Sequence, residues 1–449
     1  MRITMIGGGY VGLVSGACFA SLGADVTVIE ADPNRIDALR KGILPIFEPG
    51  LDDLAAAHHA AGRLRFVDNI SAVAGADIVF LAVGTPTRRG DGHADLSFIF
   101  DAASQLAPCL SGPTVLVTKS TVPVGTGRRL MALMAERRPD LAIAIASNPE
   151  FLREGNAIKD FMQPERIVIG TESPAAARLL AALYAPLTRA GAPLVHTGLE
   201  TAELIKYAAN SFLAMKISFI NEMADLCEKL SANVDDLVTG LGLDSRIGPR
   251  FLQPGPGFGG SCFPKDTQAL VRIAQDAGAP TRLVETVVAV NDARKAAMAS
   301  RIIAACGGSV RGRRIAILGL TFKPGTDDIR DSPALGIIHR LVDEGAHITA
   351  HDPMGMNHAR FHLPARTQLC ETAEMALREA DATVIVTEWP EFAALDPQVM
   401  RGLMRGKTVI DLRNILSAQA LCTAGLDYLA IGHAPARALR EPPLRACAS

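Results

Sequence analysis

Residues 257–266 form a glycine-rich stretch with one cysteine, whose thiol could act in covalent catalysis. Glycine lets the backbone adopt positive φ or pass close to a ligand, so Cys262 is expected on irregular backbone at a cleft. Lys265 and Asp266 follow shortly after it, and a nearby cation lowers the pKa of a thiol and favours the thiolate nucleophile. Taken alone, the same pattern also fits a buried, inert cysteine beside a turn.

A glycine pattern near the start of the chain could bind phosphate. A strand is predicted over residues 2–6, and Gly7, Gly9 and Gly12 follow it in the spacing G-x-G-x-x-G. In this motif the glycines allow a tight turn, a close approach of the backbone to a pyrophosphate, and packing of a helix on the strand. The apolar run over 13–22 predicts that helix, whose N-terminus would offer amide donors to the phosphates.

An acidic residue follows at the distance that dinucleotide sites require. A second strand is predicted over residues 25–29 and leads to Glu30, about 20 residues beyond the glycines. Its carboxylate can accept a hydrogen bond from a ribose hydroxyl and would repel a 2′-phosphate, so the pattern favours NAD over NADP. The cation of Arg35 nearby leaves NADP open as an alternative.

Three more buried strands continue the alternation of strands and helices, over residues 77–83, 115–119 and 142–146. Such strands are typical of a doubly wound parallel sheet, in which ligands bind beyond the carboxyl ends of the strands. Polar residues follow these strands: Thr85, Thr121, Glu150 and Glu154. One such residue is more often a helix cap or part of a solvated loop, but several at one edge of a sheet indicate a site.

A stretch without proline or glycine over residues 200–233 predicts one long helix. Lys206 and Asn210 are spaced i and i+4 on it, so they share one face and could both point into a cleft, or could lie on a solvated face. A helix of this length between two sheet domains also commonly serves as a spine or a dimer contact. A further helical run is predicted from 266 to about 306.

The last part of the chain predicts a second, smaller sheet domain. A strand with basic residues at its end is predicted over 314–323, and Ser332 and Pro333 begin a helix, since serine is preferred at the N-cap and proline at the first helical position. Further strands are predicted over residues 347–351, 382–387 and 408–410. This Rossmann-like domain lacks G-x-G-x-x-G, so it should bind something other than a dinucleotide, or bind it differently. The tail over 441–449 is expected to be frayed.

The composition argues against a nucleic-acid partner and for a reducing compartment. Lys and Arg number 45 against 47 Asp and Glu, a net charge of −2, whereas a nucleic-acid binder would need a basic field. The eight cysteines are scattered without a C-x-x-C pair, so neither a zinc site nor a disulfide framework is indicated, and no metal is expected. No signal peptide and no run of about 18 apolar residues is seen, which predicts a cytoplasmic protein that does not enter a membrane.

The 449 residues divide into three predicted domains. Residues 1–195 would form a nucleotide-binding domain, 196–306 a central helical domain with the cysteine loop, and 307–449 the second sheet domain. The predicted fold class is α/β, with two Rossmann-like doubly wound parallel-sheet domains joined by a central helical domain that contains one long helix.

With these residues in place, the chain resembles the UDP-glucose/GDP-mannose dehydrogenase family over nearly its whole length. The motifs occur here in the family's order: GGGYVG, VGTPT, KSTVPVGT, NPEFLREG, ELIKYAANSFLAMKISFINE, RIG, GFGGSCFPKD and GLTFKPGTDDIRDSP. Chance would not produce so many motifs in one order. Two departures are minor: Glu30 stands where many members have Asp, and the residues around Arg413 take a form that varies across the family.

The resemblance implies an enzyme that oxidises the CH2OH group of a nucleotide sugar to a carboxylate in two steps with two NAD. It implies an NAD domain, a helical middle that forms a homodimer, and a C-terminal domain that helps to bind the nucleotide of a UDP-sugar. The FPKD ending of the cysteine loop and the helix over 210–222 look more like the UDP-glucose branch, whose product is UDP-glucuronate. GDP-mannose and UDP-N-acetylmannosamine are the alternative substrates.

The resemblance also assigns catalytic roles by position, to Cys262, Lys206, Asn210, Asp266, Glu150 and Thr121. Lys206 and Asn210 would stabilise an alkoxide-like oxygen, and Cys262 would attack the aldehyde to give a thiohemiacetal and then a thioester. Asp266 or Glu150 would activate the water that hydrolyses the thioester, with the threonine of the set positioning that water. Which carboxylate acts as the base stays open.

Two sets of binding residues carry over in the same way. The expected cofactor-binding residues are Gly7, Gly9, Tyr10, Val11, Gly12, Glu30, Arg35, Thr85, Thr121, Glu154, Lys265 and Arg330. The expected substrate-binding residues are Glu150, Phe151, Leu152, Arg153, Glu154, Lys206, Asn210, Arg246, Phe251, Phe258, Gly259, Phe322, Lys323 and Arg413, with Arg246 considered for a neighbouring subunit.

Two rival functions are compatible with parts of this pattern. A one-step dehydrogenase of the hydroxyacid type also couples a nucleotide domain to a long helix, but it has no use for a cysteine in a glycine loop. A non-catalytic nucleotide-binding or scaffold protein would bind NAD and turn nothing over, and the presence of Cys262, Lys206, Asn210 and Asp266 argues against it.

Overall fold

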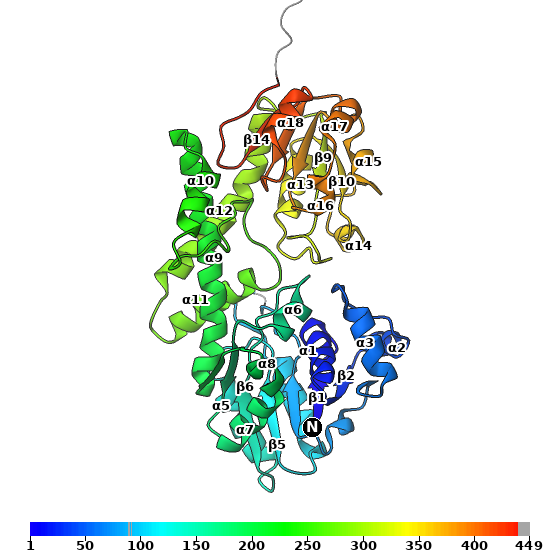
Figure 1. The fold of residues 1–449 in the computed structure, drawn as a ribbon, viewed down its shortest axis with the longest axis vertical. Coiled ribbons are helices and arrows are strands. Elements are labelled where there is room, and N and C mark those ends of the chain that lie inside the picture. The colour runs from blue at the N-terminus through cyan, green and yellow to red at the C-terminus, as the bar shows by residue number, and fades with distance from the viewer. Residues whose placement is uncertain (89, 91, 439–449) are drawn as a thin grey trace, which may run out of the picture. The chain divides into compact units, whose positions relative to one another are not determined.

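The computed structural model describes residues 1–88, 90 and 92–438 (Figure 1). The predicted frayed tail over 441–449 lies outside the described residues. The chain forms two compact units, each with its own sheet. The first unit combines Met1–Asn210 with Lys265–Thr281, and the second combines Ser211–Pro264 with the chain from Arg282 onward.

Within the described residues, the first unit builds an eight-stranded sheet in the order β3-β2-β1-β4-β5-β6-β7-β8, coloured blue to green in Figure 1. Its strands are β1 (Arg2–Ile6), β2 (Asp25–Ile29), β3 (Leu64–Val67), β4 (Ile78–Leu81), β5 (Thr114–Thr118), β6 (Ile143–Ser147), β7 (Ile167–Gly170) and β8 (Leu194–Thr197). Strands β1 to β6 are parallel, whereas β7 meets β6 through one antiparallel pair and β8 runs parallel to β7. The order of the first six strands is that of a dinucleotide-binding fold.

Helices cover both faces of this sheet. They are α1 (Tyr10–Ser21), α2 (Pro33–Arg40), α3 (Leu51–Ala60), α4 (Ser97–Leu106), α5 (Thr126–Arg137), α6 (Ala157–Met162), α7 (Pro174–Leu183) and α8 (Ala185–Arg189), with short 3₁₀ turns at Ile70–Val73 and Ala107–Cys109. Alternate strand residues enter different cores, since Ile78 and Phe80 pack with α1 and Val79 and Leu81 pack with α4 and α5. Burial on both faces confirms the predicted doubly wound arrangement.

The long helix predicted over 200–233 is α9 (Leu199–Leu230), of 32 residues, and α10 (Val234–Gly242) follows it. The single helical run predicted from 266 to 306 is wrong. The structure has two helices there, α11 (Phe263–Asp276) and α12 (Arg282–Ala305). The break has a local cause, because Gly278 adopts a φ of +69° and Pro280 cannot donate the amide bond that would continue the first helix.

The second unit builds a six-stranded, fully parallel sheet in the order β11-β10-β9-β12-β13-β14, coloured yellow to red in Figure 1. Its strands are β9 (Arg314–Leu318), β10 (His347–His351), β11 (Gln368–Leu369), β12 (Ala382–Ile385), β13 (Thr408–Asp411) and β14 (Asp427–Ala430). Its helices are α13 (Pro333–Asp343), α14 (Met356–Ala359), α15 (Ala373–Leu377), α16 (Pro390–Ala393), α17 (Pro397–Leu403) and α18 (Ala418–Thr423). Helices α12 and α13 pack on one face of this sheet and α15, α17 and α18 pack on the other.

Two predictions in this region can be checked directly. The cap is confirmed, because the Ser332 hydroxyl accepts a hydrogen bond from the Ala334 amide at 3.3 Å and Pro333 is the first residue of α13. The predicted strand over 314–323 is wrong in its second half. Strand β9 ends at Leu318 because Gly319 turns the chain with a φ of +101°, which leaves Lys323 in a loop.

Candidate active site

The glycine turn after β1 has the geometry that a dinucleotide needs. Gly7 has a φ of +109°, and a Cβ on Gly12 would lie 1.9 Å from the Gly7 carbonyl oxygen, so both positions require glycine for the turn and for helix packing. A Cβ on Gly9 would meet no atom within 4 Å, so this backbone faces open space at the start of α1. Tyr10 and Val11 begin α1 and are half-buried. The turn therefore leaves room for phosphate at the helix N-terminus.

Glu30 ends β2 with its carboxylate at the same turn. The side chain is buried, and it accepts hydrogen bonds from the Gly8 amide at 3.1 Å and the Asp32 amide at 2.9 Å. A carboxylate held beside the glycine turn fits the predicted ribose contact. Arg35 lies in the first turn of α2 and is exposed. These residues together fit NAD in the first unit.

The loops beyond β4 and β5 meet, as the sequence predicts. The Thr85 hydroxyl donates a 2.9 Å hydrogen bond to the Thr121 carbonyl oxygen. The loop beyond β6 carries Glu150, which is buried, and Glu154, which is half-buried. Polar side chains from three neighbouring strands therefore gather at the carboxyl edge of the first sheet.

Helix α9 brings Lys206 and Asn210 to buried carboxylates of the same unit. The Lys206 ammonium donates to Glu150 Oε1 at 2.8 Å, and the Asn210 amide donates to Asp266 Oδ2 at 2.6 Å. Lys265 donates to the other oxygen of Asp266 at 2.7 Å. Lys206 and Asn210 are only 3% and 6% exposed, so the alternative that they lie on a solvated helix face is wrong.

The charge of Glu150 is stabilised within this set. Burial opposes ionisation, but the Lys206 ammonium, the Leu152 amide and the more distant Lys119 outweigh it, so the pKa of Glu150 is lowered. Phe151 lies under two cations, with the Arg166 guanidinium 3.6 Å and the Lys206 ammonium 5.4 Å from its ring centre. Glu150 is therefore a carboxylate that is charged while buried.

Arg153, predicted to bind substrate, forms a salt bridge with helix α6 in this structure. Its guanidinium contacts the Asp160 carboxylate of α6 at 2.6 Å, and its backbone amide donates to the same carboxylate at 3.0 Å. In this conformation the side chain stabilises the loop, and its role toward substrate stays a prediction.

The structure adds buried polar residues that sequence reasoning did not single out. Lys119 donates to Asn148 Oδ1 at 2.9 Å and to the Tyr184 hydroxyl at 3.2 Å, and burial, partly offset by Glu150, lowers the pKa of Lys119 to about 7. A cavity of about 40 Å³ is lined by Lys119, Asn148, Tyr184 and Glu150. Lys119 and Asn148 are the first residues of the motifs KSTVPVGT and NPEFLREG, so the sequence could have indicated them. Tyr184 belongs to none of the quoted motifs.

A second missed residue is Glu203, one turn before Lys206 on α9. Its carboxylate accepts from the Gly125 and Gly127 amides, both at 2.7 Å, and so caps the N-terminus of α5 from another element. Burial raises the pKa of Glu203 to about 7 despite these two bonds. Its spacing of three residues from Lys206 could have identified it as part of the same buried face.

In the second unit, Cys262 lies at the end of the glycine loop, immediately before α11. Its side chain is half-buried, and its sulfur lies 3.5 Å from the Ser261 hydroxyl. This position is at the N-terminal end of α11, where the positive end of the helix dipole lies. Cys262 is therefore neither deeply buried nor part of a disulfide, which are the two common inert states.

The glycines of this loop are required by contacts within the second unit. A Cβ on Gly259 would lie 2.4 Å from the Asp331 carbonyl oxygen, and one on Gly260 would lie 2.7 Å from the Phe322 ring. Gly260 also donates its amide to the Arg330 carbonyl at 2.8 Å. The loop after β9 therefore packs directly on the glycine loop that carries Cys262.

Aromatic residues of the predicted substrate set cluster around the same loop. Phe258 is buried, and Asn291 of α12 bonds both its amide, at 2.8 Å, and its carbonyl, at 3.2 Å. The Phe251 and Phe258 rings each lie 6.0 Å from the Phe263 ring, measured between ring centres. Phe251 has a φ of +63°, which is unusual for a residue other than glycine.

The basic residues of the second unit differ in their surroundings. Arg413 donates to the Phe322 carbonyl at 3.0 Å, and the Lys323 ammonium lies 5.1 Å from the Phe322 ring centre. Arg330 contacts Asp328 at 2.8 Å. Arg246 is 87% exposed and pairs with its neighbour Asp244. Arg413, Lys323 and Phe322 therefore form one group, whereas Arg246 is apart from it.

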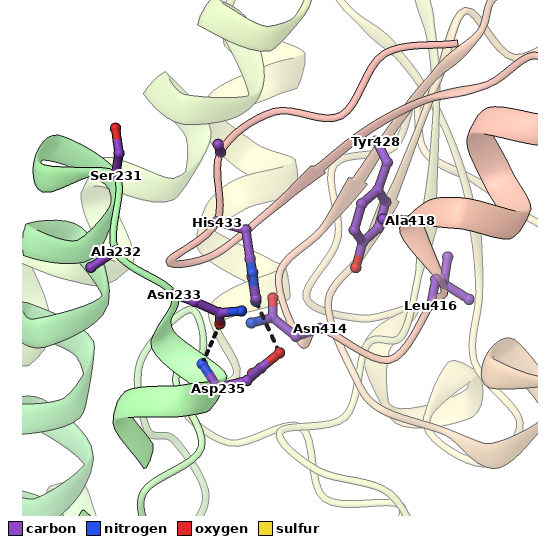
Figure 2. Close-up of a pocket in the computed structure, with 10 residues that line it drawn as sticks. Ser231, Ala232, Asn233, Asp235, Asn414, Leu416, Ala418, Tyr428 and His433 are labelled. Atoms are coloured by element: carbon purple, nitrogen blue, oxygen red, sulfur yellow. Dashed lines mark hydrogen bonds and ion pairs between the residues drawn. The ribbon is translucent and has the colours of Figure 1, made fainter. Parts of the chain in front are cut away.

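The second unit also contains a pocket of about 410 Å³ that involves none of the predicted site residues (Figure 2). Figure 2 shows His433 pointing toward Asp235, at 3.4 Å, beside Asn414. The polar groups of its wall already have partners: Asn414 bonds Ile431 in both directions and the Tyr428 hydroxyl donates to the buried Asp411. This pocket offers no unpaired buried group that would indicate chemistry.

The structure also bears on whether the chain has a metal site or a membrane-spanning helix. Across residues 1–88, 90 and 92–438, no three His, Cys, Asp or Glu side chains are grouped so that they could hold a metal ion. In that same part of the chain, no helix combines the length and apolarity needed to cross a bilayer.

Comparison with known families decides the classification. Residues 1–188 match the NAD binding domain of the UDP-glucose/GDP-mannose dehydrogenase family, residues 200–293 match its central domain, and residues 316–418 match its UDP binding domain. The chain belongs to this family. It is accordingly an NAD-dependent oxidoreductase, and its two sheets are the NAD-binding and UDP-binding domains of that family.

Individual relatives agree over nearly the full length. The chain is 55% identical to a UDP-glucose 6-dehydrogenase of Rhizobium meliloti over 435 residues, covering 96% of this chain and 99% of the relative. Among solved structures, a UDP-glucose dehydrogenase of Pyrobaculum islandicum is 37% identical with a TM-score of 0.89, covering 96% of this chain and 98% of that one. A UDP-D-ManNAc dehydrogenase of Pyrococcus horikoshii is 27% identical with a TM-score of 0.85, covering 96% and 99%.

Proposed function

We propose that the protein oxidises UDP-glucose to UDP-glucuronate by a four-electron, NAD-dependent reaction through a covalent intermediate on Cys262. The observation that carries this proposal is the pair of buried contacts on α9, Lys206 with Glu150 and Asn210 with Asp266. A buried cation and a buried amide donor one turn apart, each aligned by a carboxylate, suit a reaction in which negative charge develops on oxygen. The UDP-glucose branch is supported by the 55% identical relative of that name.

The NAD site is assigned to the first unit. The turn at Gly9 and the N-terminus of α1 would hold the pyrophosphate, and Glu30 would accept from the ribose. Bound NAD supplies a hydride acceptor at each of the two oxidation steps. Thr85, Thr121, Glu154 and Lys265 are proposed to complete the cofactor contacts in this unit. Arg330, a residue of the second unit, stays a predicted cofactor contact.

In the first oxidation the chain's residues stabilise the alkoxide that forms at C6. The Lys206 amine, paired with Glu150, can donate to this oxygen, and Asn210 keeps one amide hydrogen beyond the one that it gives to Asp266. A carboxylate, directly or through an ordered water, takes the hydroxyl proton as the hydride leaves. The product of this step is an aldehyde.

In the second oxidation Cys262 forms and then releases a covalent bond. Its thiolate adds to the aldehyde carbon, and the oxyanion takes up a proton to give a thiohemiacetal. Loss of a hydride and of that proton gives a thioester. Water, activated by Asp266 or Glu150 and positioned by Thr121, cleaves the thioester to the carboxylate and restores the thiol. The tether keeps the aldehyde bound while reduced cofactor is exchanged.

Each unit has its own set of proposed substrate contacts. The loop at residues 150–154 would contact the sugar in the first unit, and Phe258, Phe322, Lys323 and Arg413 would contact the nucleotide in the second. Arg246 would reach substrate from a neighbouring subunit.

A homodimer is the assembly that we propose for the central segment over 196–306. Helix α9 exposes a row of large apolar side chains at helical spacing: Leu204, Phe212, Phe219, Leu226 and Leu230. An exposed apolar stripe of this length suits burial against a second copy. The cytoplasm is the proposed location, because the described cysteines are free thiols.

The decisive assay counts NADH per UDP-glucose consumed, with GDP-mannose measured in parallel. The proposal predicts two NADH from UDP-glucose and none from GDP-mannose. One NADH per UDP-glucose would exclude the covalent two-step reaction in favour of a one-step dehydrogenase. Activity with GDP-mannose alone would move the protein to the sister branch of the family. No NADH from either sugar would contradict the proposed substrate and leave UDP-N-acetylmannosamine as the next substrate to assay.

A further inference from the structure

Glu48 is a buried carboxylate that neither the sequence patterns nor the proposed mechanism uses. It lies in the segment before α3 and is only 3% exposed. Its Oε2 accepts hydrogen bonds from the Tyr10 hydroxyl and from the Gly155 amide, the latter at 2.6 Å, and its Oε1 accepts from the Ala157 amide at 2.7 Å. Within the described residues, the ion pairs recorded include none for Glu48.

Two of these three donors belong to segments that the proposed function uses, and the third, Ala157, begins α6. Tyr10 is the first residue of α1 and lies inside the glycine turn that fits the dinucleotide. Gly155 ends the loop of residues 150–155 that carries Glu150 and Glu154. The carboxylate therefore joins the cofactor turn to the substrate loop across more than 100 residues of sequence, since its bond to Gly155 spans 107 positions and its bond to Tyr10 spans 38.

A structural role alone accounts for only part of this arrangement. Helix α6 begins at Ala157, and its N-cap, Asn156, makes no side-chain cap, so Glu48 supplies the missing acceptor. That role needs the bonds to Gly155 and Ala157 but not the bond to Tyr10. The Tyr10 bond ties the same buried carboxylate to a second segment, which helix capping does not require.

We propose that Glu48 is a positioning residue that couples cofactor binding to sugar-nucleotide binding. Its carboxylate holds Tyr10 of the dinucleotide turn and Gly155 of the substrate loop at one point, so ordering of either segment by its ligand orders the other. The ligand that binds second then loses less conformational freedom and binds more tightly. The identity of the two ligands rests on the proposed function, but the coupling itself is a property of Glu48, Tyr10 and Gly155.

The electrostatics support a hydrogen bond that persists under ordinary conditions. Burial, followed by the hydrogen bond to Glu48 and the negative charges of Glu48 and Glu154, raises the pKa of Tyr10. The Tyr10 hydroxyl therefore stays protonated and donates. Because Glu154 lies in the same loop as Gly155 and acts on the same hydroxyl, movement of this loop changes the surroundings of Tyr10 as well.

The test is a binding measurement that does not depend on turnover. The dissociation constant of NADH is measured by fluorescence titration with and without saturating UDP-glucose, and the ratio of the two constants is the coupling factor. For the wild type we expect a factor of about 5 to 150, the usual range for coupled sites. The reciprocal titration of UDP-glucose with and without NADH must give the same factor.

Two variants separate coupling from helix capping. Glu48→Gln keeps the side-chain volume but replaces one carboxylate oxygen, which accepts hydrogen bonds, with an NH2 group that cannot accept them. The coupling factor of this variant should fall to about 2 or below. Tyr10→Phe removes only the hydroxyl and leaves the bonds to Gly155 and Ala157 in place, and its factor should fall to the same level. The coupling factor of the double variant should match those of the single variants, because both changes remove the Tyr10–Glu48 bond on which coupling depends. Asp52→Asn, an exposed carboxylate in the first turn of α3, is the matched control and should retain the wild-type factor.

Each outcome has a defined meaning. Loss of coupling in both single variants, with no further loss in the double variant, supports the proposal. A wild-type factor of 1, or an unchanged factor in Tyr10→Phe, overturns it while leaving the proposed function intact. Failure of the wild type to bind NADH or UDP-glucose at all contradicts the proposed function instead. If Glu48→Gln does not fold, as shown by thermal melting, Tyr10→Phe alone decides.

Discussion

The two sheets of this protein share one strand order but use its carboxyl edge differently. In each sheet six adjacent strands follow the order 3-2-1-4-5-6. A glycine with positive φ follows the first of these strands along the chain, and an acidic residue follows the second. In the first unit that acid is Glu30, which accepts from two amides at the glycine turn. In the second unit it is Asp352, which is completely buried.

Asp352 is saturated by its own domain. Its Oδ2 accepts from the Leu320 amide at 2.7 Å and from the amide and hydroxyl of Thr321 at 2.9 and 3.0 Å, and the Trp389 indole lies at 3.2 Å. Its Oδ1 accepts from two further amides, one of them that of Gly355 at 2.6 Å. The acid that could bind a ribose in one domain therefore braces the turn in the other.

The turn sequences explain this difference. Gly319 corresponds to Gly7, but Thr321 stands where the first unit has Gly9, so the open backbone position is lost. A strand order of this kind provides an edge where a ligand can bind, and the side chains at the turn decide whether a dinucleotide fits there. The comparison assigns the dinucleotide-binding turn to the first unit.

The largest expected effect concerns Asp352. Replacing it with Asn leaves several buried donors facing an amide, which should cost about 3 to 5 kcal/mol of stability in the second unit. Thermal melting should show an early transition, whereas NADH affinity should be unchanged because the glycine turn lies in the other unit. Loss of NADH affinity in a folded Asp352→Asn protein would contradict the assignment.

A matched pair of glycines tests the turn itself. Gly12→Ala would place a Cβ 1.9 Å from the Gly7 carbonyl oxygen, so NADH should bind roughly 100-fold more weakly. Gly336→Ala, in the helix that follows the first strand of the second sheet, would meet no atom within 4 Å. It should leave affinity unchanged and stabilise the fold slightly. Equal effects of the two substitutions on NADH binding would remove the distinction between the turns.

A buried acid of the first unit should make its stability depend on pH. Burial raises the pKa of Glu203 to about 7 from an ordinary value of 4.5, so the folded state binds this proton more tightly than the unfolded chain. At pH values below 4.5 this group contributes up to about 3 kcal/mol to the free energy of unfolding. That contribution is lost as the pH rises through 7.

The corresponding experiment compares variants across pH. The stability advantage of the wild type over Glu203→Gln should shrink between pH 5 and pH 8 in chemical unfolding. Glu222→Gln, at an exposed position of the same helix, should show no such trend. A constant difference between wild type and Glu203→Gln across this range would show that the carboxylate stays ionised in the folded protein.

The smallest expected effect concerns the ribose contact. Glu30→Ala should weaken NADH binding about 10-fold and reduce the discrimination against NADPH, because one charged acceptor and its repulsion are removed. Its melting temperature should change less than that of Asp352→Asn. Titrations with both cofactors check this, and an unchanged preference for NADH would mean that Glu30 does not contact the ribose.

Sequence reasoning succeeded where local chemistry determines local structure. The strand and glycine turn at Gly7, the cap at Ser332 and the long helix through Lys206 follow from short-range rules, and the structure confirms them. The buried pairing of Lys206 with Glu150 was anticipated only as a shared helix face. Its partner, 56 positions earlier, depends on the assembled sheet.

The features that were missed depend on long-range packing. Glu48, Glu203 and Lys119 look like ordinary charged residues in the sequence, and only the folded chain shows that backbone amides and buried side chains surround them. The two-residue strand β11 and the antiparallel contact of β7 carry no periodic pattern that a sequence could display. The break between α11 and α12, in contrast, had a readable signal in Gly278 and Pro280.

The most direct test of the whole account is to look for the covalent intermediate on Cys262. Protein is mixed with UDP-glucose and NAD, quenched in acid within one turnover, and examined by intact mass and peptide mapping. The account predicts a mass increase of one UDP-glucuronyl group on the peptide that contains Cys262. In Cys262→Ala the adduct and net turnover should both disappear while NADH binding remains. Formation of two NADH per UDP-glucose without an adduct, or full activity of Cys262→Ala, would contradict it.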